Sequence, residues 1–342
     1  MFLYIFVLLM LFVGACKSPA KSGVNISFYY WKTQFQLNSF EKDLLIQNDV
    51  KRLYVRYFDI NLIRKNDANT ALPQAVISFE KQDIPQGIEI IPVVYIKNKV
   101  MENATINLDS LAKNTGDLIN LINTQNNITI HHIQLDCDWS LETKDRFFDF
   151  IEKLKTYTKI DIGSTLRLHQ VKYYGKTGIP DVDTPVLMYY NMLAVNANGH
   201  NAIYDQKTAS RYNGSLANYP KPLNVAIPIY SWFVHSRSGT IIELFSKKPI
   251  STIKENEKLN PVSDHIFEVK ENHIFWGTYL KKGDLLKYDA VSKSGIRTIL
   301  EDLNEYLNSP PTEIILYDLD ELNFKNQAYE KDFFKQEINH IW

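Results

Sequence analysis

Apolar segments rich in aromatic and β-branched residues recur along the chain and alternate with stretches of helical periodicity. Short apolar segments of this kind predict buried strands, whereas apolar residues three or four positions apart predict helices. The predicted strands are 26–34, 52–59, 88–96, 131–139, 159–169, 185–192, 223–233 and 313–319. The clearest helical periodicity lies at 108–123, 142–157 and 294–307. This alternation predicts a (β/α)8 barrel (TIM barrel), a fold that needs about 250 residues or more.

The main alternative to the barrel is an open, doubly wound α/β sheet. Such sheets usually carry a glycine-rich phosphate-binding turn after the first strand. Residues 29–34, at the end of the first predicted strand, contain no glycine, so the barrel is favoured. After strand 7 we expect an insertion at about 236–290. Within it, residues 266–269 and 273–276 predict a hairpin that could roof a cleft.

The first 13 residues form an apolar run, which is shorter than the roughly 20 residues of a membrane-spanning helix. The following Val13-Gly14-Ala15-Cys16 resembles a bacterial lipobox, in which the cysteine is lipidated and becomes the mature N-terminus. We therefore expect a lipoprotein signal peptide at 1–16, a flexible tether at 17–25 and a single barrel domain at 26–342. An ordinary signal peptide is the alternative, because no Lys or Arg precedes the apolar run.

Both interpretations of the N-terminus export the protein, and lipidation of Cys16 would attach it to a membrane of a bacterial cell envelope, with the outer membrane as the expected one. The formal net charge is -1, which argues against a nucleic-acid partner held by basic steering. Once the signal peptide is removed, Cys137 is the remaining cysteine, so the core and not a disulfide must stabilise the fold. The sequence has no metal or nucleotide motif, and we expect no cofactor and no metal.

Two carboxylates lie within one predicted strand, at Asp136 and Asp138. Side chains alternate along a strand, so both acids share one face and Cys137 points to the other. A carboxylate that faces a core costs several kcal/mol unless it is paired or hydrogen-bonded. The two acids are therefore predicted to line a cleft, with a buried structural pair near Arg167 as the alternative.

Polar and aromatic side chains also lie at the carboxyl ends of the other predicted strands, where parallel barrels place their functional residues. Acids, an arginine and flat rings together are typical of sugar binding, because rings stack on pyranoses and carboxylates accept hydrogen bonds from hydroxyls. The candidate substrate-binding residues are Trp31, Asp59, Trp139, Arg167, His169, Tyr190, Asn191, Tyr230, Trp232, Asp318 and Asp320.

Most of these candidates also have a structural interpretation. Trp139 and Trp232 would then be packing aromatics, and Arg167 would be a plain ion-pair partner. His169 would be a loop histidine. On the second strand, Tyr57 is predicted to share a face with Asp59.

Asp136-Cys137-Asp138-Trp139 resembles the fourth-strand signature of family-18 glycoside hydrolases, the chitinase-type barrels, which is Asp-x-Asp-x-Glu. Leu187-Met188-Tyr189-Tyr190-Asn191 similarly resembles the Met-x-Tyr-Asp stretch of that family. The resemblance implies hydrolysis of O-glycosyl bonds, with Asp138 orienting the N-acetyl group of the substrate and Tyr190 supporting its acetamide. It also places the position of the general acid at Ser140.

A serine hydroxyl cannot protonate a glycosidic oxygen as a carboxylic acid can, and loss of a general acid typically costs 10²–10⁴-fold in rate. Three interpretations follow: a hydrolase that uses another acid, a non-hydrolytic carbohydrate-binding lipoprotein, or a scaffold without a ligand. The candidate catalytic residues are Asp136, Asp138 and Glu142, and Asp59, Asp318 and Asp320 are further candidate acids. We expect a barrel that cleaves or binds a glycan at its C-terminal face.

Overall fold

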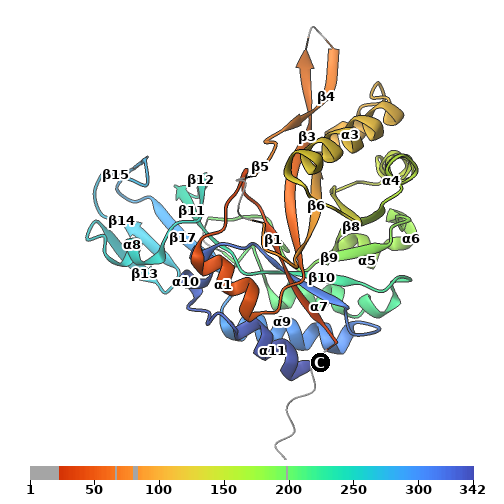
Figure 1. Ribbon diagram of the computed structural model, residues 1–342. Coiled ribbons are helices and arrows are strands. Elements are labelled where there is room, and N and C mark those ends of the chain that lie inside the picture. The colour runs from red at the N-terminus through yellow and green to blue at the C-terminus, as the bar shows by residue number, and fades with distance from the viewer. Residues whose placement is uncertain (1–22, 66–67, 80–83, 198) are drawn as a thin grey trace, which may run out of the picture.

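The computed structural model describes residues 23–65, 68–79, 84–197 and 199–342, and its main feature is a closed barrel of eight parallel strands (Figure 1). The strands are β1 (Asn25–Tyr30), β3 (Arg52–Lys65), β6 (Glu89–Ile96), β7 (His132–Asp136), β8 (Asp161–Arg167), β9 (Thr184–Met188), β10 (Asn224–Pro228) and β18 (Glu313–Tyr317). They follow one another in the order β1-β18-β10-β9-β8-β7-β6-β3, and β1 also pairs with β3. This closure confirms the predicted (β/α)8 barrel. The predicted signal peptide and Cys16 lie outside the described residues.

Helices surround the barrel, and the three predicted from periodicity, at 108–123, 142–157 and 294–307, are present with ends within three residues of those bounds. They are α1 (Ser39–Gln47), α2 (Asn98–Glu102), α3 (Leu108–Asn126), α4 (Lys144–Thr158), α5 (Leu168–Lys172), α6 (Tyr174–Thr177), α7 (Gln206–Asn213), η1 (Leu216–Asn218), α9 (Lys293–Tyr306), α10 (Glu321–Gln327) and α11 (Phe333–Ile341). The described part of the connection from β3 to β6 instead contains β4 (Ala68–Gln74) and β5 (Ser78–Phe79). None of the helices in the described residues is long and apolar enough to cross a membrane.

A second sheet is inserted between β10 and α9. It contains β11 (Ser231–Arg237), β12 (Thr240–Ser246), β13 (Leu259–Ser263), β14 (Ile266–Val269) and β17 (Leu285–Ala290), with α8 (Ile250–Lys254) and the hairpin β15 (His273–Phe275)–β16 (Thr278–Leu280) beside it. The strands are antiparallel in the order β12-β11-β17-β14-β13. A separate cluster of buried apolar residues, including Phe233, Phe267 and Leu286, forms the core of this insertion.

The pairing within the insertion differs from the sequence prediction in two places. The predicted strand 223–233 is interrupted after Pro228, because β10 pairs with β9 and β18 whereas β11 pairs with β12 and β17. The predicted hairpin is wrong, since β14 pairs with β13 and β17, and β15 pairs with β16. Several partners are available to each of these short strands, and sequence spacing does not select among them.

A β-bulge in β3 changes which of its side chains face the inside of the barrel. The register with β6 shifts between Arg56 and Phe58, so Tyr57 is the additional residue. The Tyr57 hydroxyl donates to Asn123 Oδ1 of α3 at 2.7 Å, outside the barrel wall. The prediction that Tyr57 shares a face with Asp59 is therefore wrong, because one inserted residue reverses the alternation that follows it.

A buried ion pair attaches the insertion to the segment that follows β9. Lys287 Nζ lies 3.1 Å from Asp289 Oδ1, and the two side chains are 3% and 2% exposed. Lys287 also donates to Asn196 Oδ1 at 3.1 Å and to the carbonyl oxygen of His200 at 2.9 Å. Asp289 accepts a hydrogen bond from the Trp232 indole nitrogen at 3.1 Å. The pair therefore also fixes the orientation of that tryptophan.

Asp289→Ala should lower the free energy of unfolding by roughly 3–5 kcal/mol, because it leaves the Lys287 ammonium buried without its counter-charge. Chemical denaturation followed by fluorescence measures this change. Lys287→Met/Asp289→Leu removes both charges and should recover much of the loss. Glu330→Ala, which breaks an exposed ion pair with Lys293, is the control and should have little effect. An equally small effect of Asp289→Ala would contradict the role assigned to the buried pair.

Candidate functional site

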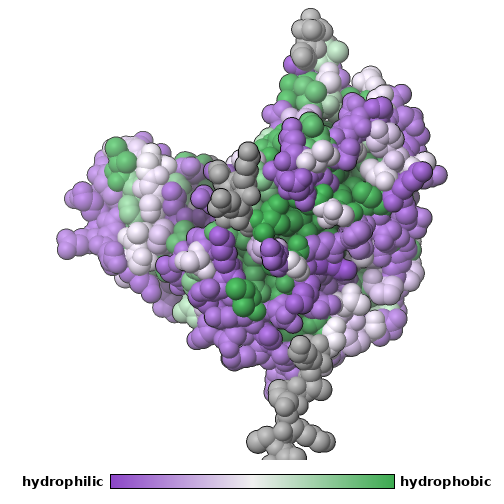
Figure 2. Space-filling model, in the orientation of Figure 1, coloured by the Kyte–Doolittle hydropathy of each residue, from purple (hydrophilic) through white to green (hydrophobic). Residues whose placement is uncertain are grey.

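A cleft of about 500 Å³ opens at the carboxyl-terminal end of the barrel. In Figures 1 and 2, the insertion and the β3–β4 hairpin rise on two sides of a hollow in the outline of the molecule. Every barrel strand, or the residues directly after it, contributes to the lining, and β11, β12 and α10 add to it. The sequence-predicted residues that line the cleft are Trp31, Asp59, Asp136, Arg167, Tyr190, Asn191, Tyr230, Trp232 and Asp318.

Aromatic rings form a connected group on one side of the cleft. Tyr317, the last residue of β18, lies at its centre, with ring centroids 5.4 Å from Tyr190, 5.4 Å from Trp31 and 5.5 Å from Tyr230. Trp232 continues the group at 5.4 Å from Tyr230. Four of these rings come from the ends of four different barrel strands and Trp232 comes from β11, so the fold brings together residues that are far apart in sequence.

The hydroxyl group of Tyr190 has no hydrogen-bond partner among the described residues, although the side chain is buried. A buried polar atom without a partner is unfavourable, and such atoms are uncommon in folded proteins. The neighbouring Tyr230 hydroxyl, in contrast, donates to Asn191 Oδ1. Tyr190 is therefore the lining residue with the clearest unused hydrogen-bonding capacity.

Asp138 is held by Arg167 in a two-point ion pair. Arg167 Nε lies 2.6 Å from Asp138 Oδ1, and Nη2 lies 2.8 Å from Oδ2. The arginine lines the cleft, whereas Asp138 is not among the lining residues and its side chain is 47% exposed. Both carboxylate oxygens of Asp138 are thus engaged by a cation that itself lines the cleft.

Asp136 differs from Asp138 in its surroundings. Its side chain is buried and lines the cleft, and Thr165 Oγ1 donates to Asp136 Oδ1 at 2.7 Å. Burial raises the pKa of Asp136 to about 6, and the charge of Asp138 adds to this effect, while Thr165 and Arg167 oppose it. Asp136 is consequently a carboxyl group that can hold a proton in mildly acidic solution.

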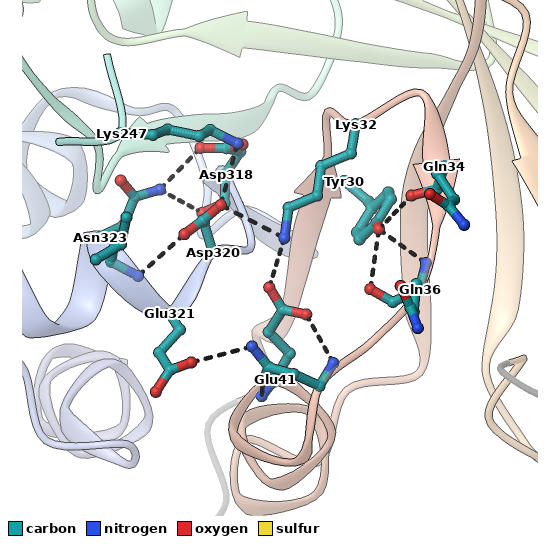
Figure 3. Close-up of polar contacts among 12 residues, drawn as sticks. Tyr30, Lys32, Gln34, Gln36, Glu41, Lys247, Asp318, Asp320, Glu321 and Asn323 are labelled. Atoms are coloured by element: carbon teal, nitrogen blue, oxygen red, sulfur yellow. Dashed lines mark hydrogen bonds and ion pairs between the residues drawn. The ribbon is translucent and has the colours of Figure 1, made fainter. Parts of the chain in front are cut away.

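The insertion reaches the barrel rim through Lys247, which follows β12 (Figure 3). Its ammonium lies 2.8 Å from Asp318 Oδ2 and 3.2 Å from Asp320 Oδ2. Asn323 holds the other oxygen of Asp318 at 2.8 Å, and Lys32 lies 3.4 Å from Asp320. Asp318 therefore lines the cleft as part of an ion pair with Lys247. Asp320 also contacts Lys247 but does not line the cleft.

Besides Asp138 and Asp320, three further predicted site residues lie outside the cleft lining. Trp139 is buried outside the barrel wall, stacked on Phe147 at 5.2 Å and donating to the carbonyl oxygen of Thr177 at 3.1 Å. His169 belongs to α5 and is exposed, and Glu142 is exposed in the turn before α4. None of the three lines the cleft. Trp139 lies three residues beyond the end of β7, and it packs on Phe147 outside the barrel wall.

Ser140 also lies outside the cleft lining. Its backbone amide donates to Thr143 Oγ1 at 2.9 Å, and its carbonyl oxygen accepts from the amide of Lys144 at 3.0 Å. These bonds belong to the turn that leads into α4. The Glu142 carboxylate bonds to the Ser140 side chain, which lowers the pKa of Glu142, but Glu142 does not line the cleft.

Other lining residues were missed by the sequence reasoning: Arg56, Tyr95, Met188, Ser231, Ser246, Lys247, Tyr317 and Asn323. Tyr317 directly precedes the predicted Asp318, so attention to whole strand ends could have found it. Arg56 was hidden by the β-bulge at Tyr57. Lys247 comes from the insertion, and no sequence signal connects it to the barrel.

Neither a family model nor a curated protein sequence matches this chain. Its fold is nevertheless similar to solved structures. The Bacillus megaterium spore cortex-lytic enzyme SleL matches at 11% identity over 92% of this chain and 75% of that chain, with a TM-score of 0.56. A Bacteroides thetaiotaomicron chitinase matches at 9% identity over 92% of this chain and 96% of that chain, with a TM-score of 0.55. A mutant family-18 chitinase from Cycas revoluta, in complex with (GlcNAc)4, matches at 12% identity over 93% and 100%, with a TM-score of 0.52.

These similarities show that the chain has the chitinase-type (β/α)8 barrel fold. At such low identity they extend to the fold and not to the chemistry of the cleft. That chemistry must be argued from the lining residues of this chain.

The raised pKa of Asp136 predicts a pH-dependent stability difference between the wild type and Asp136→Asn. Between about pH 4 and pH 6 the folded wild type holds more protons than the unfolded chain, so its stability falls as the pH rises through this range. The asparagine variant has no titrating carboxyl group at this position. Its free energy of unfolding, relative to wild type, should therefore rise by about 2–3 kcal/mol from pH 4 to pH 7.5.

Urea denaturation of both proteins at several pH values measures this difference. A difference that stays constant from pH 4 to pH 7.5 would contradict the assignment of a raised pKa to Asp136.

Proposed function

We propose that this protein binds a glycan in the cleft at the C-terminal end of its barrel and does not hydrolyse it by the chitinase-type route. The connected ring group around Tyr317 carries the proposal. Trp31, Trp232 and Tyr317 of this group are only partly buried, and exposed ring faces stack on the apolar faces of pyranose rings. The unpartnered Tyr190 hydroxyl can bond to a sugar substituent. A cleft of about 500 Å³ is within the range of small-ligand sites.

Two features support binding without hydrolysis by that route. The residue at the general-acid position is Ser140, whose backbone is bonded into the turn before α4. Asp138, which the resemblance would assign to the substrate N-acetyl group, is occupied at both oxygens by Arg167. The chitinase-type mechanism therefore lacks a carboxylic acid at its proton-donor position, and its orienting carboxylate is held in an ion pair.

Hydrolysis through Asp136 is a second candidate function, and its raised pKa favours it. A carboxylic acid in a cleft with a pKa of about 6 can act as a proton donor near neutral pH. In this case the acid would come from the strand itself and not from the position of Ser140.

The cellular location stays part of the proposal. A lipid on Cys16 would anchor the barrel to a membrane of the bacterial cell envelope, where glycans are accessible to an exported protein. Mass spectrometry of the N-terminal peptide of protein from the membrane fraction would test this anchor.

Trp232→Ala should weaken glycan binding by about tenfold or more, because a lost stacking contact of about 1.4 kcal/mol corresponds to a tenfold change in Kd. Isothermal titration calorimetry with (GlcNAc)4, cellotetraose and mannotetraose measures the affinities. Tyr190→Phe, which removes only the hydroxyl group, should weaken binding of the same glycan more modestly. Tyr279→Ala alters an exposed aromatic residue outside the cleft lining and serves as the matched control. Failure of the wild type to bind any glycan would overturn the proposal.

Release of reducing ends from the bound glycan distinguishes the two candidate functions. We expect no release by the wild type. Release that disappears in Asp136→Asn but persists in Asp138→Asn would support hydrolysis through Asp136. Release that disappears only in Asp138→Asn would instead show that the chitinase-type route operates despite Ser140.

A further inference from the structure

Two arginine side chains line the cleft on either side of Asp136. Arg56 belongs to β3 and Arg167 ends β8, and the strands β6 and β7 lie between them in the barrel wall. Their side chains are 15% and 24% exposed, so both are largely withdrawn from solvent. The Arg56 guanidinium also lies over the Trp31 ring, with Cζ 5.6 Å from the ring centroid.

Each guanidinium is fixed in orientation by one carboxylate. Arg56 Nε donates to Asp59 Oδ1 at 2.7 Å and its Nη2 donates to Oδ2, while Arg167 makes the corresponding pair of bonds to Asp138. Both arginines therefore use the edge formed by Nε and Nη2. The described residues accept no hydrogen bond from Nη1 of either arginine. A rigid arginine with one edge held by an acid presents its remaining N–H groups in a defined direction.

The remaining N–H groups require a ligand rich in acceptor atoms, because a guanidinium donates and never accepts. A carboxylate is the best match, since its bonds to arginine are charge-assisted and can be made at two points. The carboxylates of the protein that line the cleft would repel a ligand carboxylate only weakly. Asp59 and Asp318 in the lining are each paired with a cation, and Asp136 can be protonated.

We propose that the glycan bound in this cleft carries a carboxylate, as a uronic acid does, and that Arg56 and Arg167 recognise this group through the edges left free by Asp59 and Asp138. This inference rests on the proposed glycan-binding function and names its ligand class. It assigns the two ion pairs a role in specificity as well as in stability.

The test compares acidic oligosaccharides with neutral ones of the same backbone. Tetramers of galacturonate, glucuronate and mannuronate are each titrated in a calorimeter against the full chain, in parallel with their carboxyl-reduced counterparts. At least one acid should bind about tenfold or more tightly than its reduced counterpart. Its affinity should fall with added NaCl, whereas the affinity of the neutral form should not.

The variants Arg167→Gln/Asp138→Asn and Arg56→Gln/Asp59→Asn remove a guanidinium and its carboxylate together, so no charge is left unpaired. Each should reduce the preference for the acid by about 10- to 100-fold, with a smaller effect on the neutral counterpart. Arg297→Gln/Glu337→Gln removes a similar two-point pair outside the cleft and should leave the preference unchanged. Thermal unfolding of each variant shows whether it is folded. If a double variant does not fold, Arg167→Lys provides a second test, because lysine keeps the positive charge but cannot make the two-point contact of a guanidinium.

The outcomes separate this inference from the proposed function. If a neutral glycan binds and no acid binds more tightly than its reduced form, the carboxylate inference fails while glycan binding stands. An acid preference that persists in both double variants would also overturn it, because other residues would then provide the recognition. If neither acidic nor neutral glycans bind, both proposals fail.

Discussion

Closure of the sheet between β1 and β3 is the constraint on which the candidate site depends. Phe28 pairs with Leu53 and Tyr30 with Val55 across this seam, which turns a row of strands into a ring. Trp31, one residue beyond the seam, consequently lies against Arg56. In an open sheet the ends of β1 and β3 could lie at opposite edges, and the aromatic residues and acids would not surround one cleft.

The polar groups around the cleft hold the structure together as well as form its lining. Lys247 connects the insertion to Asp318 and Asp320 on the barrel rim, and the buried Lys287–Asp289 pair connects it to the segment after β9. Because these charges are paired, they can be withdrawn from water without the full cost of isolated ions. The insertion therefore has a defined position beside the cleft, and Ser246 and Lys247 from it become part of the lining.

A chitinase-type barrel does not by itself specify chitinase chemistry. The fold positions the ends of eight strands, and the reaction depends on which side chains those ends carry. Here Arg167 occupies both oxygens of Asp138, and Ser140 lies outside the cleft. Burial raises the pKa of Asp136, and the hydrogen bond from Thr165 and the charge of Arg167 only partly oppose this effect. These side chains are the basis of our proposal that the cleft holds a glycan and does not hydrolyse it by the chitinase-type route.

The sequence alone determined the features that depend on local periodicity. The run of strands and helices predicted the barrel and most of the residues that line the cleft, whereas Trp139, which was also predicted to bind substrate, packs outside the barrel wall. The tertiary structure decided what depends on distant partners: the bulge at Tyr57, the two-point geometry of the ion pair between Arg167 and Asp138, and the strand pairing within the insertion. It also brought Lys247 to the cleft. Such contacts form between residues far apart in the chain, so their geometry is set by how the elements pack and leaves no pattern in the local sequence.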